Sequence, residues 1–203
     1  MGALRRILLI PVFVGAIGIA ALLTASPAHA GEVTAEEQQF IYDLNEARQD
    51  PAAYAAQHLS GSVATLVSGF SPRPPLAVES LISEAAQARA DDMVDDQYFA
   101  HSNPSTGFGP SEALDEVGYE WSSWGENIGL GYGTPESMLI GFLNSNSGHR
   151  ESVMGQGSTA QTFREIGVGH RSGTGDPRYD NIWAVLLAGP RYTEPSLTGV
   201  VYD

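Results

Sequence analysis

Three side chains suited to acid–base or metal chemistry lie far apart along the chain: His101, Glu126 and His149. Two imidazoles and one carboxylate form a donor set that suits Zn²⁺ or another divalent cation, with a fourth position open to water. In a metal-dependent hydrolase, Glu126 would act either as a ligand or as the general base toward that water. The three residues are separated by 25 and 23 positions, so only the fold can bring them together.

Each of these residues also has a structural interpretation. Glu126 lies in the glycine-rich stretch Trp124–Gly133, which is predicted to form a turn, and its carboxylate can accept backbone amides there. Asn127 suits that role better, because asparagine readily bonds to nearby backbone groups. His149 is predicted at a helix exit, where a positive charge is favoured. Arg150 is assigned a structural role, in which it pairs with Glu126 or with a helix terminus.

A serine–histidine–acid triad is a further interpretation, since Ser147 lies two residues before His149. Triads are recognised by geometry, and the chain has no Gly-x-Ser-x-Gly nucleophile elbow, so the triad is disfavoured. His170 follows a predicted strand and is expected to be a surface or rim histidine. Four aromatic residues near these motifs could line an apolar groove or simply pack the core: Tyr98, Phe99, Trp121 and Trp124.

Local patterns predict the helices that must position these residues. Capping residues, proline positions and apolar stripes mark helices at 34–49, 51–59, 78–98, 111–117 and 134–143, and 148–154 is predicted to be a last short turn. The first begins with the capping box Thr34-Ala-Glu-Glu37. Residues 60–75 are predicted to be a loop and residues 155–162 a surface insertion. The aspartates within 91–96 are predicted to form a solvated acidic face, because calcium loops space their ligands differently.

Two strands are predicted near the end of the chain, at 165–170 and 182–188, with a loop rich in Gly, Asp and Pro between them. This arrangement favours an antiparallel hairpin. The second strand is almost entirely apolar, which indicates that both faces of the sheet are covered. The sequence therefore predicts an α+β fold with helices on both sides of a small, mostly antiparallel sheet.

Composition limits the class of partner. The chain has no cysteine and no lysine, and its 203 residues carry ten arginines against 24 acidic residues. Without cysteine there is neither a disulfide nor a thiolate zinc site. Removal of Arg5 and Arg6 with the N-terminal segment would leave eight arginines and a net charge of −16. Such a charge repels nucleic acids and anionic membrane surfaces.

The N-terminal segment 1–30 has the features of a secretory signal peptide. Two arginines precede the apolar run Ile7–Leu23, and Ala28-His-Ala30 is a small-x-small cleavage site. The run of 17 residues is short for a membrane span of about 20. We therefore expect a secreted protein, free in the medium or periplasmic, with one domain over 31–203 and no stable span after cleavage.

Five segments resemble, in order, the landmarks of the CAP superfamily (cysteine-rich secretory, antigen 5 and pathogenesis-related proteins) in its bacterial SCP-like extracellular form. They are Phe40–Arg48, His101–Pro104, Gly125–Gly129, Ser147–Arg150 and Ile166–Gly169. The resemblance covers about residues 36–190. It implies a three-layer α-β-α sandwich with a central antiparallel sheet.

The resemblance also implies a cleft with two histidines and two acids that can bind a divalent metal such as zinc. His101, Glu126 and His149 match three of these positions. The second acid is expected shortly after the aromatic residue of this helix, but the chain reads Phe142-Leu-Asn-Ser145 there, with no acid, and Ser145 is assigned only a supporting role. A three-ligand site is the most that this set can provide.

Three functions stay open at this point. The first is a secreted binding module for a small apolar ligand, lipid-like or sterol-like, which a metal could modulate. The second is a divalent-metal-dependent hydrolase that uses His101, Glu126 and His149. The third is a structural or interaction protein with a partner at the cell surface. The absence of the second acid disfavours the enzyme.

Overall fold

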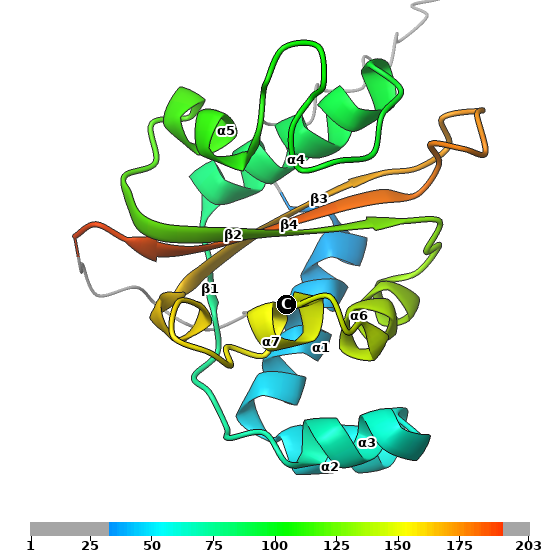
Figure 1. Ribbon diagram of the computed structural model, residues 1–203, viewed down its shortest axis with the longest axis vertical. Helices are drawn as coiled ribbons and strands as arrows, with labels where there is room; N and C mark the ends of the chain where they lie inside the picture. The colour runs from blue at the N-terminus through cyan, green and yellow to red at the C-terminus, as the bar shows by residue number, and fades with distance from the viewer. Residues whose placement is uncertain (1–32, 193–203) are drawn as a thin grey trace, which may run out of the picture.

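A four-stranded sheet with the order β1-β3-β4-β2 separates two groups of helices in the computed structural model, which describes residues 33–192 (Figure 1). The strands are β1 (Ala77–Val78), β2 (Trp121–Leu130), β3 (Glu165–Arg171) and β4 (Ile182–Pro190). β3 and β2 both pair antiparallel with β4, and β1 adds a short parallel pair at the β3 edge. The sheet is therefore mostly antiparallel, as predicted.

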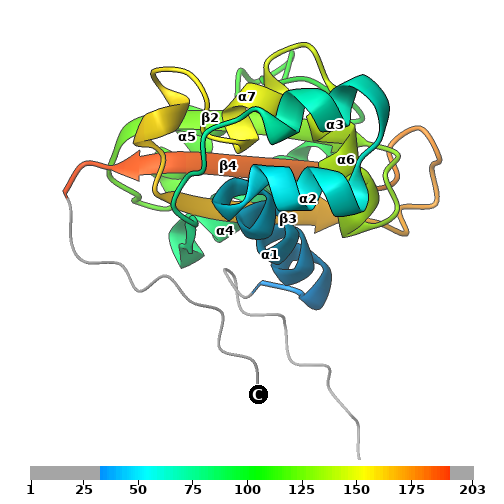
Figure 2. The ribbon, with the colours of Figure 1, turned by 90° about the horizontal axis from the view of Figure 1, so that it is seen from below.

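The helices lie on both faces of this sheet. Helices α4 (Ser80–Asp95) and α5 (Pro110–Glu116) cover one face (Figure 1). The other face carries α1 (Ala35–Gln49), α6 (Pro135–Asn144) and α7 (His149–Val153), with α2 (Pro51–His58) and α3 (Gly61–Ser68) packed outside them (Figure 2). This is the α+β, three-layer α-β-α arrangement that the sequence predicted.

Strand β4 lies at the centre of the sheet and is buried from Ile182 to Gly189, because helices cover both of its faces. On the α1 side, Trp183 packs against Phe40, with ring centroids 5.9 Å apart, and Phe40 in turn meets Phe142 of α6 edge-on. On the α4 side, Leu186 and Ala188 pack with Ile82 and neighbouring residues. Burial of apolar side chains on both faces is the main contribution to the stability of this sheet.

The capping box at the start of α1 is confirmed. The Thr34 hydroxyl accepts from the Glu37 amide at 3.3 Å, and the Thr34 amide donates to Glu37 at 2.8 Å. The second oxygen of the Glu37 carboxylate accepts from the backbone amide of His170 at 2.9 Å. The cap therefore also fixes the start of α1 to β3.

Two predicted elements were wrong. The stretch Trp124–Gly133 was predicted as a glycine-rich turn, but residues up to Leu130 belong to β2. A Cβ on Gly129 would lie 2.1 Å from the sulfur of Met138, so this glycine permits a close approach of α6 to the strand. The predicted loop 60–75 contains helix α3, which forms because Val67 packs into the main core.

Other boundaries shift by a few residues. The predicted helix 78–98 begins at Ser80 and ends at Asp95, since residues 77 and 78 pair with β3. The predicted surface insertion contains a short 3-10 turn, Ala160–Thr162. The predicted signal peptide lies outside the described residues. Within residues 33–192, no helix is long and apolar enough to cross a membrane.

Candidate functional site

Glu126 lies in the middle of β2, opposite Leu186 of β4, and its side chain is directed toward α4. Only 1% of the side chain is exposed. One carboxylate oxygen accepts from Nε of Arg89 at 2.9 Å, and the other accepts from Nδ1 of His101 at 2.7 Å. Both oxygens of the carboxylate are thus occupied by cationic or potentially cationic donors.

Arg89 is the residue of this site that sequence reasoning missed. Its fully buried guanidinium, on α4, donates to Glu126, to the Tyr98 hydroxyl at 2.7 Å and to the carbonyls of Ala100 and Phe108 at 3.0 and 3.2 Å. Burial alone would lower the pKa of Arg89, but the charge and hydrogen bonds of its partners outweigh burial and raise the pKa. Arg89 therefore binds both Glu126 and the loop that carries His101.

A signal for Arg89 is present in the sequence. The apolar stripe of α4 runs through Ile82, Ala86 and Met93, and Arg89 occupies the helical position between the last two. A charged residue at a core position is almost always paired. This position therefore predicts a buried acid opposite it, which is Glu126.

His101 joins the carboxylate from a half-exposed position, with 57% of its side chain accessible. The hydrogen bond to Glu126 raises the pKa of His101, against the lowering effect of burial and of the nearby Arg89. The contact with Glu126 therefore favours the charged imidazolium form more than in a free histidine.

His149 is the first residue of α7, after Gly148 in the left-handed conformation with φ 95°. The prediction of a helix exit was wrong, and a cation is disfavoured at a helix start. Its Nδ1 is hydrogen-bonded to the Ser145 hydroxyl at 3.0 Å, and its ring lies against Phe142. Burial, together with the charge of His101, lowers the pKa of His149. The two histidines are therefore shifted in opposite directions.

Ser145 ends the stretch Phe142–Ser145, in which the resemblance led us to expect an acid, and its hydroxyl is the partner of His149. The same hydroxyl bonds Ser147 at 2.8 Å. Arg150 donates to the Ser145 carbonyl, which ends α6, so Arg150 stabilises a helix terminus and not Glu126. Because Ser147 bonds Ser145 and Glu126 bonds His101, the disfavoured triad does not assemble.

Asn127 follows Glu126 but points to the opposite face of the sheet, as alternation along a strand requires. It is buried, and its side-chain amide donates to the Ser152 hydroxyl of α7 at 3.1 Å. Its predicted role in holding a turn was wrong, because residue 127 lies within a strand. Asn127 instead ties α7 to the sheet.

Two hollows adjoin successive parts of β2. The first has a volume of about 390 Å³ and includes Trp124, Glu126 and His101 in its lining, together with Ser111 and Glu112 of α5. The second has a volume of about 420 Å³. It combines apolar and aromatic side chains with polar ones: Phe99, Ile128, Leu130, Tyr132, Met138, Phe142, Asn144, Ser145 and His149. The predicted cleft is thus divided, with His101 and Glu126 in one hollow and His149 in the next.

The donor set does not fit a three-ligand metal site in this arrangement. Among the described residues, no group of three or more His, Asp or Glu side chains is placed to hold a metal ion. Both oxygens of Glu126 are already bound to Arg89 and His101, and Nδ1 of His149 is bound to Ser145. No chemical step is therefore assigned to a metal.

Two further expectations need correction. His170 is not a surface or rim residue: it lies in β3 and stacks on Trp183, with ring centroids 3.8 Å apart and only 6% of its side chain exposed. The aspartates within 91–96 do not all form a solvated face. Asp92 and Asp96 both accept from the buried Asn103 side chain, which anchors the loop after α4.

Glu126 lies in β2, His101 in the loop after α4 and His149 at the start of α7. No family model matches the chain. Over 142 residues the chain is 29% identical to the uncharacterised protein YkwD of Bacillus subtilis (strain 168). The match covers 63% of this chain and 52% of YkwD, so the chain spans about half the length of that curated relative.

Two solved structures are similar to the chain. One is an extracellular protein containing an SCP domain from Bacillus anthracis str. Ames, with 27% identity and a TM-score of 0.47 over 57% of this chain and 34% of that one. The other is an outer surface protein from Borrelia burgdorferi, with 15% identity and a TM-score of 0.54 over 77% and 93%. The second likeness is one of fold.

Proposed function

We propose that the protein is a secreted, SCP-like binding module that takes up a small ligand with an apolar body and a polar group. The hollow beside His149 carries this proposal. Its volume of about 420 Å³ lies within the range of small-molecule sites, and most of the side chains that line it are apolar or aromatic. A lipid-like or sterol-like molecule fits this lining.

Two aromatic side chains at this hollow favour ligand uptake over simple core packing. Phe99 and Tyr132 are 41% and 37% exposed and are among the few large hydrophobic residues at the surface of the described chain. Exposed aromatic groups beside a hollow offer apolar contact to a ligand and cost little to desolvate further. On the polar side, burial lowers the pKa of His149 and so favours its neutral ring, which can hydrogen-bond a hydroxyl or carboxyl group.

Displacement of a fluorescent fatty acid by unlabelled lipids tests the proposal on the mature chain. We expect saturable binding that weakens by about tenfold in Phe99→Ala, since an aromatic contact of this size contributes about 1–2 kcal/mol. Leu66→Ala is the matched control, because Leu66 is also an exposed apolar residue but lies on α3. Equal weakening in both variants, or no saturable binding, would contradict the proposal.

A second candidate function is acid–base catalysis along β2. The observation that favours it is that His101, bound to Glu126, and His149, bound to Ser145, lie in adjoining hollows along β2 with their pKa values shifted in opposite directions. A screen of carboxylic esters tests this candidate. Turnover that is lost in both His101→Ala and His149→Ala, with folding intact, would favour catalysis over binding.

A further inference from the structure

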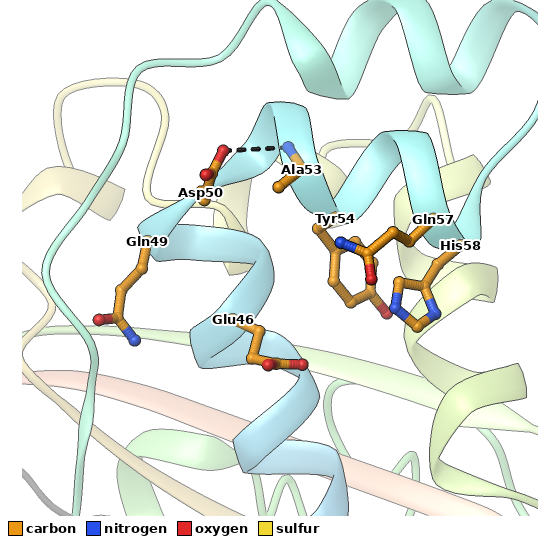
Figure 3. A pocket seen from close by; sticks show the side chains of 7 residues that line it. All are labelled: Glu46, Gln49, Asp50, Ala53, Tyr54, Gln57 and His58. Atoms are coloured by element: carbon orange, nitrogen blue, oxygen red, sulfur yellow. Dashed lines mark hydrogen bonds between the residues drawn. The ribbon is translucent and has the colours of Figure 1, made fainter.

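A third hollow lies at the corner between α1 and α2, and Figure 3 shows the side chains around it. Its volume is about 260 Å³. Glu46, Gln49 and Asp50 contribute from the end of α1, and Ala53, Tyr54, Gln57 and His58 contribute from α2. This hollow shares no lining residue with the hollow beside Glu126 or with the hollow of the proposed function.

Tyr54 gives this hollow an unmet hydrogen-bonding requirement. The residue is only 4% exposed, and its buried hydroxyl has no hydrogen-bond partner among the described residues. The His58 ring stacks on the Tyr54 ring, with centroids 4.4 Å apart and an angle of 19° (Figure 3). A buried hydroxyl without a partner costs free energy, and a ligand that supplies a partner recovers it.

The polar lining of the hollow consists mainly of acceptors. Glu46 and Asp50 are carboxylates, and among the lining residues only His58 can carry a positive charge. The side-chain amide of Gln49 donates to the Asn45 carbonyl, which leaves its oxygen as an acceptor. One Glu46 oxygen accepts from the Tyr42 hydroxyl and one Asp50 oxygen from the Ala53 amide, so each carboxylate keeps an oxygen for a ligand.

Nearby acids add to the negative potential. Burial first, and then the charges of Asp43, Glu136 and Glu46, raise the pKa of Tyr54. Burial also raises the pKa of Asp43, with the Gln39 hydrogen bond and His58 acting against it and Glu46 and Glu136 acting with it. Nδ1 of His58 lies 3.8 Å from the Glu136 carboxylate. A bound cation would relieve this excess of negative charge.

We propose that this hollow binds a guanidinium group, the head of an arginine side chain. A guanidinium has five N–H donors, pairs with carboxylates through two parallel hydrogen bonds, and stacks on aromatic rings. These properties match two carboxylates, an amide oxygen and the His58 ring, whose side chain is 36% exposed where it covers Tyr54. An ammonium group has three donors and no plane to stack, so it fits this lining less well.

Titration of the mature chain with N-acetyl-arginine amide, followed by NMR, tests the proposal. We expect one-to-one binding that weakens by about tenfold in Glu46→Gln, because a charge-assisted contact is lost. N-acetyl-lysine amide should bind more weakly than the arginine probe. Glu116→Gln on α5 is the matched control, since it removes an exposed carboxylate away from this hollow.

Tyr54→Phe tests the hydroxyl separately, because it removes one atom and keeps the stacked ring. We expect it to weaken arginine binding while the melting temperature stays at or above that of the wild type. Binding that is equal in wild type, Glu46→Gln and Tyr54→Phe, or a lysine probe that binds as well as arginine, would overturn the proposal. If a short arginine peptide binds more tightly than the amide, the guanidinium group comes from a protein partner. If the two bind equally, it comes from a small molecule.

Discussion

Arg89 and Glu126 form an ion pair of 2.9 Å between helix α4 and the edge strand β2, and neither side chain has more than 1% of its surface exposed. The pair joins one helical layer to the sheet and at the same time fixes the carboxylate that holds His101. Because both charges are buried, each depends on the other for its stability in the folded state.

Replacing one partner of this pair should therefore be costly. Arg89→Met leaves Glu126 buried without its main partner, and we expect the free energy of unfolding to fall by about 3–5 kcal/mol at neutral pH. Urea unfolding measures this loss. The double variant Arg89→Met, Glu126→Leu should recover a large part of it, because it leaves no uncompensated buried charge. If the double variant is no more stable than Arg89→Met, the pair is not the source of the loss.

Sequence patterns predicted the layers of this fold because its helices and strands repeat local rules. The Thr34–Glu37 capping box and the apolar run of β4 each indicate their element within a few residues. Glu126 was predicted to lie in a turn because glycines flank it. Gly125 and Gly129 are instead required because Phe163 and Met138 pack closely against them. A Cβ on Gly125 would lie 2.9 Å from the Phe163 ring. Such packing is not visible in local sequence.

The sequence predicted which residues form most of the candidate site, but not how they contact one another. His101 and Glu126 do meet, whereas the partner of His149 is Ser145. The spacing of residues along the chain gives no information about which hydroxyl or carboxylate reaches which imidazole. Arg89 was missed because its significance depends on burial, which becomes evident only when its place in the apolar stripe of α4 is considered.

The two histidines should titrate on opposite sides of the ordinary value of 6.5. We expect NMR titration to give a midpoint above this value for His101, because Glu126 accepts a hydrogen bond from its ring. We expect a midpoint below it for His149, because the ring is partly buried. In Glu126→Gln the midpoint of His101 should fall while that of His149 changes less. Coincident midpoints in the wild type would contradict the geometry described for both rings.

The contribution of His101 to stability should depend on pH with a defined sign. Since its folded pKa is raised, its bond to Glu126 stabilises the protein fully below the unfolded pKa near 6.5 and is lost as pH rises through the folded pKa. The lowered pKa of His149 acts in the opposite direction, and its contribution is lost as pH falls below the unfolded value. The unfolding free energies of His101→Asn and His149→Asn, each compared with the wild type across pH 5–8, measure the two contributions separately.

Helix α4 approaches β3 so closely that Gly167 admits no side chain. A Cβ there would lie 2.2 Å from the backbone of Ile82 and Ser83, which cannot move as a flexible side chain would. We expect Gly167→Ala to lower the free energy of unfolding by about 3 kcal/mol or more. Gly133→Ala is the matched control, because a Cβ there has no neighbour within 4 Å. Equal effects in the two variants would show that α4 can shift at little cost.

Substitution of Ser145 tests why His101, Glu126 and His149 do not fit a metal site. In the wild type, a hydroxyl binds Nδ1 of His149 where the resemblance implied an acid, and Arg89 and His101 occupy both oxygens of Glu126. We therefore expect calorimetric titration with Zn²⁺ to show no tight one-to-one binding.

Ser145→Glu should raise the pKa of His149 and increase zinc affinity, since a carboxylate is both a charge partner and a ligand. Ser147→Glu is the control for added charge alone. If the wild type binds one zinc ion with micromolar affinity and His149→Ala abolishes it, the side chains must rearrange around the ion, and Glu126 must leave Arg89 or His101 to do so.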